Sequence, residues 1–315
     1  MARIFITGAR GFIGKHLARS LAAAGHKVCG LGHGIWPESN AAAWGLVQWI
    51  NGEVTPSNLR HLQQTFGTPN VVYHLAGGSS VGVAIANPRE DFFRTVATTA
   101  ELLDWLRLDA PETRLVAISS AAVYGAGHAG CIPERVPLKP FSPYGYHKQL
   151  MEELCQSYAD SYGTKVTIAR LFSVYGSGLK KQLLWDLCSR LAAGANPLTL
   201  GGTGQELRDW INVRDVVLAL ELLAEMASNE VPVFNVGTGL ATPVCEIAAR
   251  IAQLWAGNCQ PAKLSFTGQS RKGDPFSLVA ETSCIQSLGF NSQIGVDQGL
   301  SDYVNWYRKH EEVGL

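Results

Sequence analysis

The chain has 315 residues, of which 46% are hydrophobic, and its 26 Lys and Arg residues balance 26 Asp and Glu residues. A chain of this length and composition can bury one large core or two lobes, as expected of a soluble enzyme. Its formal net charge of zero excludes a general attraction to nucleic acid or to an anionic membrane.

Seven cysteines are scattered along the sequence, and none forms a C-x-x-C pair. This pattern predicts neither a disulfide framework nor a zinc site, and no metal centre is expected. No apolar run approaches the length of a membrane span, and no signal peptide precedes the first predicted strand. We therefore expect a protein of the reducing cytoplasm that does not bind membranes.

The first predicted element is a buried parallel strand at Arg3–Thr7, a short apolar run. A glycine-rich turn follows, with the spacing G-x-x-G-x-x-G, and an amphipathic stretch then covers residues 15–24. Such a turn between a strand and a helix lets the backbone approach a pyrophosphate, which the helix N-terminus attracts. The alternative is a tight turn that needs glycine for steric reasons alone. The position at the start of a strand–helix unit favours a dinucleotide site, whose predicted residues are Gly8, Arg10, Gly11, Phe12, Ile13 and Gly14.

The second predicted strand, residues 27–31, leads into Gly32-His33-Gly34, with no acidic residue before Glu38. NAD-binding folds place Asp or Glu at this point to hold the ribose 2′-hydroxyl. Its absence leaves room for the 2′-phosphate of NADP, to which Arg10 and His33 can supply positive charge. NADP is therefore favoured over NAD as the cofactor. The alternative is that Arg10 is solvated and backbone groups hold the ribose.

Strand and helix signals continue to alternate to about Arg170. Apolar runs flanked by turn residues predict parallel strands at residues 70–75, 114–119 and 165–170, and helical stretches include residues 89–106 and 144–162. This βαβ alternation predicts an α/β protein with a doubly wound parallel sheet of the Rossmann type. After Ser173 the pattern loosens and Gly and Pro punctuate the sequence, which indicates a smaller C-terminal substrate-binding lobe.

Tyr144 and Lys148 lie four residues apart and so share one face of the predicted helix. A free tyrosine has a pKa of about 10, and a nearby ammonium favours the phenolate and lowers that pKa. Tyr144 can then exchange a proton with a hydroxyl or a ketone. Ser120, which ends an apolar strand, can hydrogen-bond the same oxygen. A Tyr-x-x-x-Lys pair alone arises by chance in many helices, so its meaning depends on the surrounding motifs.

The glycine turn, Ser120, Tyr144 and Lys148 together resemble the extended short-chain dehydrogenase/reductase family, which contains the NAD(P)-dependent nucleotide-sugar epimerases and dehydratases. Further blocks carry the resemblance along nearly the whole chain, at residues 74–77, 169–176, 201–215, 234–239 and 271–275. It implies that Tyr144 is the general acid/base, that Lys148 lowers the pKa of Tyr144 and holds the nicotinamide ribose, and that Ser120 orients the reacting oxygen. Leu75, Ala76, Tyr144 and Lys148 then join the predicted cofactor contacts.

The resemblance also implies that the substrate is a nucleotide-diphosphate sugar. Arg208 and Arg271 match positions that hold the diphosphate, for which a planar guanidinium fork is suited. Ser173 replaces an Asn that is common at this position, so it is predicted to alter substrate contacts. His74, at a strand end, is expected to be structural, and His147 is expected to point away from the site.

Two alanines, Ala121 and Ala122, follow Ser120. Family members that dehydrate nucleotide sugars carry Asp-Glu there, and members that epimerise carbons 3 and 5 carry Cys in place of Ala122. The remaining chemistry needs hydride transfer and one acid/base. The favoured prediction is an epimerase that acts through a transient keto intermediate, most often at carbon 4, and the alternative is an NADPH-dependent 4-keto nucleotide-sugar reductase. Remoter alternatives are a carboxylate supplied by another residue and a non-catalytic relative that senses NADP(H).

The resemblance finally predicts how the chain is organised. It implies a dinucleotide-binding domain over residues 1–172, to which residues 210–226 return, and a substrate-binding lobe over residues 173–315. Family members commonly pair through the helix that carries the tyrosine and the helix before it. We therefore expect a homodimer, with contacts from Phe93, Ala97, Leu150 and Leu154.

Overall fold

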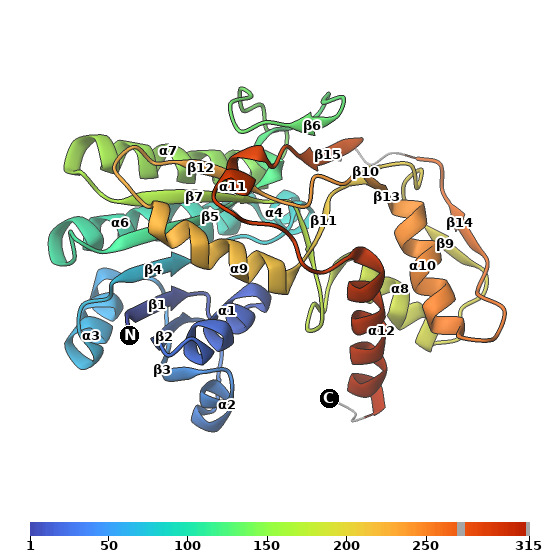
Figure 1. Cartoon of the computed structure of the whole chain (residues 1–315), viewed down its shortest axis with the longest axis horizontal. Coiled ribbons are helices and arrows are strands. Elements are labelled where there is room, and N and C mark those ends of the chain that lie inside the picture. Colours follow the sequence, from blue (N-terminus) through green and yellow to red (C-terminus); the bar gives the residue numbers. More distant parts are fainter. Residues whose placement is uncertain (270–274, 313–315) are drawn as a thin grey trace.

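The computed structural model describes residues 1–269 and 275–312, without the side chains of residues 311 and 312. Its centre is a parallel sheet of seven strands, which are β1 (Arg3–Thr7), β2 (Lys27–Gly32), β3 (Leu46–Asn51), β4 (Val71–His74), β5 (Arg114–Ser120), β7 (Val166–Leu171) and β12 (Val233–Val236). They lie in the order β12-β7-β5-β4-β1-β2-β3 (Figure 1). The predicted doubly wound fold is confirmed, because the strand order changes direction between β1 and β4.

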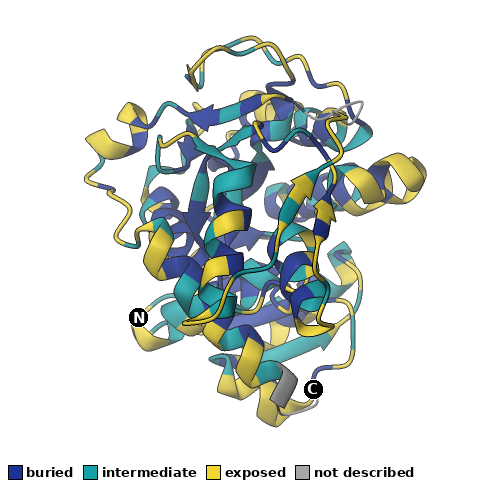
Figure 2. Ribbon diagram, turned by 90° about the vertical axis from the view of Figure 1, so that its right-hand side faces the viewer, coloured by how far each residue is buried: buried dark blue, intermediate teal, exposed yellow. Residues whose placement is uncertain are grey.

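Helices cover both faces of the sheet, and each face has its own buried apolar cluster. Helices α1 (Phe12–Ala23), α2 (Glu38–Ala43), α9 (Val213–Leu223) and α11 (Ser283–Ser287) contribute to one cluster, and α3 (Pro56–Phe66), α6 (Thr98–Asp109) and α7 (Pro143–Tyr162) to the other. Each fully buried leucine, such as Leu17 or Leu59, contributes roughly 1.5–3 kcal/mol. In Figure 2 the sheet is accordingly buried, whereas outward helix surfaces are exposed.

A smaller lobe lies beside the carboxyl ends of the strands, on the right in Figure 1. Its core joins Leu187, Ile251 and Tyr303. Its elements are α8 (Gln182–Ala192), α10 (Val244–Ala256), α12 (Val296–Glu312), β9 (Leu198–Leu200) and β14 (Leu264–Phe266). Short strands β6 (Cys131–Ile132), β10 (Leu207–Arg208), β13 (Thr242–Pro243) and β15 (Ser277–Ala280) form a second sheet, and β8 (Ser173–Tyr175) pairs with β11 (Trp210–Asn212).

The chain passes between the sheet and the lobe more than once. Helix α9 packs against α1, and β12 pairs in parallel with β7 at the edge of the large sheet. Strand β12 lies beyond the return predicted for residues 210–226, and the domain division at residue 172 stays a prediction. Among the described helices, none is long and apolar enough to cross a membrane.

The predicted element bounds hold best for the buried strands. β1 has the predicted bounds, and β2, β4, β5 and β7 agree within one residue at either end. β3 was not predicted, because it is an edge strand whose residues are mostly half-buried or exposed, so its sequence lacks a clear apolar run.

The predicted helix over residues 89–106 is divided in the structure. α5 (Pro88–Phe92) is followed by a π-helical turn, η1 (Phe93–Ala97), before α6 begins. The Thr98 hydroxyl donates to the Arg94 carbonyl at 2.5 Å, a side-chain bond that competes with the regular helical ladder. The widened turn directs the Thr95 hydroxyl to the backbone N–H of Gly78, which donates to it at 2.8 Å. A break in the helix thus holds the loop after β4.

His74 ends β4 inside the protein and is structural, as the sequence predicts. Its Nδ1 lies 2.7 Å from the Thr7 hydroxyl and its Nε2 lies 3.0 Å from the Thr99 hydroxyl. Burial lowers the pKa of His74 to about 3, and the charge of Lys148 acts in the same direction. The neutral imidazole therefore links β1, β4 and α6.

We predict a pH-dependent loss of stability that depends on His74. An unfolded histidine binds a proton near pH 6.5, whereas folded His74 does not until about pH 3. Its contribution is therefore complete above pH 6.5 and is lost as the pH falls toward 3. Between about pH 7 and about pH 5, the free energy of unfolding measured in urea should fall by about 2 kcal/mol more for the wild type than for His74→Gln. Equal losses in the two proteins would show that His74 titrates normally.

Candidate active site

A cavity of about 1260 Å³ lies between the carboxyl ends of the strands and the lobe. Open α/β sheets bind ligands at this edge, where the strand order changes direction. Pockets for a single small ligand measure roughly 300–1,000 Å³, so this cavity has room for more than one ligand. The sheet side contributes residues 8, 10–14, 75–82, 118–122 and 171–174, and the lobe contributes residues 179, 181–184, 186, 190, 200–202, 206, 208 and 210.

The glycine turn after β1 brings the backbone close to the loop after β4. Gly8 has a φ of +72°, and a Cβ there would lie 2.8 Å from the Ala76 nitrogen. A Cβ at Gly14 would lie 2.5 Å from the Gly8 carbonyl oxygen. Helix α1 follows Gly11 and has no side-chain cap, so its first N–H groups are available to an anion. This turn fits a dinucleotide pyrophosphate, and the predicted contacts line the cavity, namely Gly8, Arg10, Gly11, Phe12, Ile13, Gly14, His33, Leu75 and Ala76.

The end of β2 presents positive charge to the same cavity. The Arg10 guanidinium lies so close to Gly34 that a Cβ on Gly34 would be 2.2 Å from Nη1. The N–H of Gly34 donates to Asn51 Oδ1 at 2.8 Å, which fixes the turn. Arg10 and His33 are both exposed and both line the cavity. Arg10 and His33 thus lie where NAD-binding folds usually place a carboxylate.

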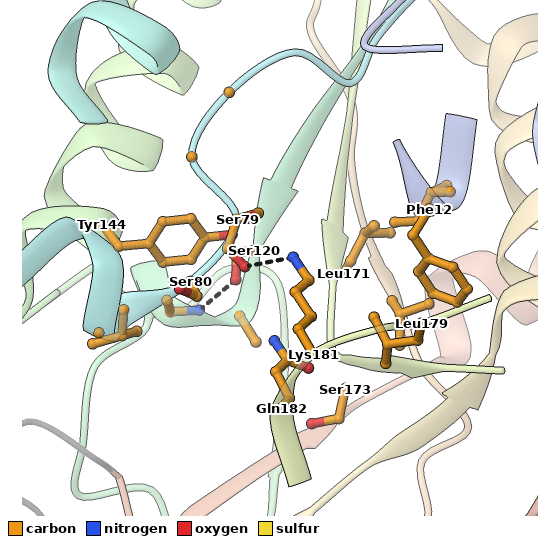
Figure 3. Close-up of a pocket in the computed structure, with 18 of the residues that line it drawn as sticks. Phe12, Ser79, Ser80, Ser120, Tyr144, Leu171, Ser173, Leu179, Lys181 and Gln182 are labelled. Carbon is orange, nitrogen blue, oxygen red and sulfur yellow. Dashed lines mark hydrogen bonds between the residues drawn. The ribbon is translucent and has the colours of Figure 1, made fainter. Parts of the chain in front are cut away.

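Ser120 of β5 and Tyr144 and Lys148 of α7 all line the cavity. Figure 3 shows Ser120 and Tyr144 close together there. Ser142 caps α7 by accepting from the Gly145 N–H at 3.2 Å, and Pro143 occupies the first turn. The Ser120 hydroxyl accepts from the Ala122 N–H at 3.2 Å, and Lys148 Nζ donates to the Ile118 carbonyl at 2.8 Å. The bond from Lys148 attaches the helix to the end of β5.

The protonation of Tyr144 differs from the sequence-based prediction. Burial raises the pKa of Tyr144, the hydrogen bond with Ser120 opposes that rise, and the charge of Asp91 adds to it. The direction is opposite to the lowering by Lys148 that the spacing predicts. Burial also lowers the pKa of Lys148 to about 8, although the nearby carboxylates Asp91 and Glu152 act against this effect. Tyr144 therefore retains its proton and can donate it.

A buried ion pair fixes α7 against the sheet. Glu152 of α7 and Arg170 of β7 are 6% and 5% exposed, and their closest atoms, Oε2 and Nη2, lie 2.6 Å apart. Ser119 donates to Glu152 at 2.5 Å, and Arg170 donates to the Tyr124 hydroxyl at 3.0 Å. Tyr124 in turn donates to Asn235 at 2.6 Å. One network thus joins β5, α7, β7 and β12.

Asp91 and His147 form a second pair beside the site. Asp91 is 4% exposed, and its Oδ2 lies 2.6 Å from His147 Nδ1. A Cβ on Gly78 would lie 1.8 Å from Asp91 Oδ1, so this carboxylate also packs under the loop after β4. His147 does not line the cavity, which agrees with the prediction that it points away from the site, and it binds a carboxylate that influences both Tyr144 and Lys148. No motif in the sequence signals this pair, because its members lie on separate helices.

The lobe contributes a polar and aromatic wall. Ser173 and Arg208, which are predicted to contact the substrate, both line the cavity, and Arg208 donates to the carbonyls of Leu207 and Phe276 at 2.8 and 3.3 Å. Trp210 lines the same wall, and its buried Nε1 has no hydrogen-bond partner among the described residues. Arg271, the third predicted substrate contact, lies outside the described residues.

Asp209, next to Arg208, has a structural role behind the cavity wall. Its fully buried carboxylate accepts from the N–H groups of Thr238, Gly239 and Ala280 at 2.7, 2.8 and 3.1 Å. Burial raises the pKa of Asp209, and these hydrogen bonds act against the rise. Asp209 therefore holds β10, β15 and the loop after β12 together, behind the cavity wall.

The sequence analysis missed Lys181, which enters the cavity from the lobe. It directly precedes α8, and Figure 3 shows its amine directed toward Ser79 and Ser120. Nζ donates to the Ser79 carbonyl at 3.4 Å. The residue lies where the strand and helix pattern loosens, so no periodicity indicates which of the neighbouring lysines, Lys180 and Lys181, faces the site.

A doubly wound sheet with a glycine turn after β1, and with serine, tyrosine and lysine together at its carboxyl edge, defines an enzyme of the short-chain dehydrogenase/reductase class. The model described as "NAD dependent epimerase/dehydratase family" matches residues 4–237, and the chain belongs to this family.

Similar proteins are matched along nearly their whole length. The "Putative UDP-glucose 4-epimerase" of Methanocaldococcus jannaschii is 27% identical over 98% of this chain and 100% of its own. The solved structure "MoeE5 in complex with UDP-glucuronic acid and NAD" is 31% identical over 98% of this chain and 99% of that chain, with a TM-score of 0.85. The UDP-glucose 4-epimerase of Thermotoga maritima with UDP-glucose is 25% identical over the same shares, with a TM-score of 0.86.

We predict that Tyr144→Phe lowers turnover by roughly two to four orders of magnitude, because the phenol is the group placed to move a proton. Dinucleotide binding should stay nearly unchanged, since the ring and Lys148 remain. Steady-state rates and fluorescence titration with dinucleotide measure the two effects. A variant with full turnover would remove Tyr144 from the reaction.

Proposed function

We propose that the protein is an NAD(P)-dependent nucleotide-sugar epimerase that inverts carbon 4 through a transient keto sugar. One observation carries the proposal: Ser120, Tyr144 and Lys148 line the same cavity, while the two positions after Ser120 are alanines. Neither Ala121 nor Ala122 can remove the proton next to a ketone, as dehydration requires. The names of the similar proteins from Methanocaldococcus jannaschii and Thermotoga maritima support the same reaction.

Ser120, Tyr144 and Lys148 would have different roles in this reaction. A dinucleotide held by the glycine turn would supply the acceptor for the hydride of carbon 4 and the source of its return. Burial favours the protonated phenol, so Tyr144 would act as the proton acceptor only in its phenolate form, which nearby positive charge favours. In that form Tyr144 would receive the proton of the 4-hydroxyl and return it to the oxygen after inversion. Ser120 accepts from the Ala122 N–H, so its own hydroxyl proton is available to the same sugar oxygen. Lys148 would hold the nicotinamide ribose, since an ammonium has donors beyond the bond to Ile118.

A second function, reduction of a 4-keto nucleotide sugar by NADPH, is favoured by the end of β2. Arg10 and His33 line the cavity there, and the segment from β2 through Gly34 contains no carboxylate. We propose NADP rather than NAD as the cofactor on this ground, although the similar protein MoeE5 was solved in complex with NAD. A reductase consumes reduced dinucleotide and must exchange it in every turnover. An epimerase regenerates its oxidised dinucleotide and benefits from holding it tightly.

The released cofactor distinguishes the two functions. We expect that the purified protein, when denatured, releases near-stoichiometric oxidised dinucleotide that carries a 2′-phosphate, as identified by chromatography and mass spectrometry. Oxidised NAD in the same amount would support the epimerase and contradict the NADP proposal. Protein that arrives empty, and that oxidises added NADPH with a 4-keto nucleotide sugar, would establish the reductase instead.

The cysteines support the proposed compartment. All seven are free, and Cys29, Cys155 and Cys188 are buried in the core. Free thiols of this kind persist in a reducing environment. We therefore propose that the protein works in the cytoplasm.

We also propose a homodimer formed through η1, α6 and α7. Phe93 is 51% exposed and Leu150 is 40% exposed, and Ala97 and Leu154 are half-buried on the same helices. Helices α6 and α7 pack against each other, so two copies can form a four-helix bundle. Pairing would bury apolar side chains that are costly to leave in water.

We predict that Phe93→Glu combined with Leu150→Glu yields monomers, because two buried carboxylates would face an apolar partner. Light scattering at micromolar concentration measures the mass. Leu240→Glu, at a 68% exposed leucine away from these helices, is the matched control and should stay dimeric. A wild-type protein with the mass of one chain would contradict the proposed dimer.

A further inference from the structure

Lys181 enters the same end of the cavity as the residues proposed to move the hydride and the proton. Its Nζ reaches the Ser79 carbonyl, and in Figure 3 the amine is directed toward Ser79 and Ser120. Ser120 and Tyr144 would contact the oxygen on carbon 4 of the sugar. The ammonium therefore lies at the sugar end of the cavity.

The contacts of Lys181 are too weak to explain its burial. The side chain is half-buried, and its bond to Ser79 is 3.4 Å long, whereas ordinary N–H···O bonds measure about 2.7–3.2 Å. Within residues 1–269 and 275–310, no carboxylate forms an ion pair with it. Burial lowers the pKa of Lys181, because it removes water from the charged form. A ligand anion would satisfy this charge.

The backbone also holds Lys181 in place. Gln182, the first residue of α8, has a φ of +66°, in the left-handed region that side chains other than glycine rarely adopt. Residues with such a strained backbone cluster at active sites and ligand-binding positions. The turn directs Lys181 inward, whereas its neighbour Lys180 is exposed.

The charges that line the cavity are distributed unevenly. Asp186 and Glu206 are the only carboxylates among the described lining residues. Asp186 pairs with Arg190 at 3.5 Å, and Glu206 accepts from the Thr203 N–H at 2.8 Å. Near Ser120, by contrast, the lining contains two ammonium groups, from Lys148 and Lys181.

We propose that Lys181 determines substrate specificity by binding a carboxylate on the sugar, so that the substrate is a nucleotide-diphosphate uronic acid with its carboxylate at carbon 6. This inference rests on the proposed function, because the epimerase reaction places carbon 4 at Ser120 and Tyr144. Carbon 6 is attached to carbon 5, the neighbour of carbon 4, and so lies near Lys181. The diphosphate is attached to carbon 1, on the far side of the ring, and Arg208 lines the lobe wall of the cavity.

The test compares two substrates that differ only at carbon 6, UDP-glucuronate and UDP-glucose. It is repeated with the same two sugars carried on thymidine diphosphate in place of uridine diphosphate. Each is measured with the wild type, Lys181→Met and Lys180→Met. Methionine keeps the length of the lysine stem and removes its charge. Lys180 is the matched control, because it is adjacent and exposed and does not line the cavity.

We expect the wild type to prefer the uronate. Lys181→Met should raise the dissociation constant of the uronate by about tenfold to hundredfold, which corresponds to the loss of a charge-assisted hydrogen bond. Binding of the neutral sugar should change less than about twofold, and Lys180→Met should affect neither sugar. An equal loss for both sugars would overturn the proposal, because Lys181 would then hold the diphosphate or the fold. A wild type that prefers the neutral sugar, or binds neither, would also overturn it.

Calorimetry separates this proposal from the proposed function, because it measures binding whether or not a reaction follows. A Lys181-dependent preference for the uronate without inversion at carbon 4 would retain the carboxylate site and reject the epimerase. Inversion at carbon 4 with no preference between the two sugars would retain the epimerase and reject the carboxylate site.

Discussion

The buried ion pair between Glu152 and Arg170 is the constraint on which the site depends. Charges are costly to remove from water, and a pair of this kind is stable only when its remaining hydrogen-bonding groups are satisfied. Ser119 and Tyr124 meet this need, at 2.5 and 3.0 Å. Removal of one partner would leave a buried charge and cost about 3–5 kcal/mol. The pair therefore determines how α7 lies on the sheet, and with it the direction in which Tyr144 and Lys148 point.

The electrostatics of the site follow from the same packing. Because α7 is pressed against β5, Lys148 is buried and its pKa falls to about 8, while burial keeps the proton on Tyr144. The charge of Asp91, which pairs with His147, acts against the lowering of the Lys148 pKa. The same charge adds to the rise in the Tyr144 pKa. The tyrosine and lysine are thus tuned by two carboxylates that the Tyr-x-x-x-Lys pattern does not contain.

The features that could be predicted from the sequence are those that depend on residues close together in the chain. The apolar run of β1 and the glycine turn after it depend on neighbouring residues, and both lie where the sequence places them. The break in the helix at Phe93–Ala97 depends on threonine hydroxyls that bond to the backbone, which hydrophobic periodicity does not detect. Lys181 was missed because its role arises from a contact with Ser79, 102 positions earlier in the chain. The direction of the Tyr144 pKa was wrong because spacing along a helix does not report burial.

The repeated passage of the chain between sheet and lobe limits how this protein can be recombined with its relatives. Phe234 and Val236 of β12, together with Ile285 and Phe290, belong to the buried cluster on one face of the large sheet. A chimera that exchanged everything after residue 172 would replace part of that core along with the cavity wall. An exchange of substrate preference is better attempted with the segment between β8 and β11, residues 176–209, which contains Lys181 and Arg208 and begins and ends beside two strands that already pair. This segment contains α8, β9 and β10 and part of the lobe core, so a graft changes the lobe but leaves the two buried clusters of the large sheet in place.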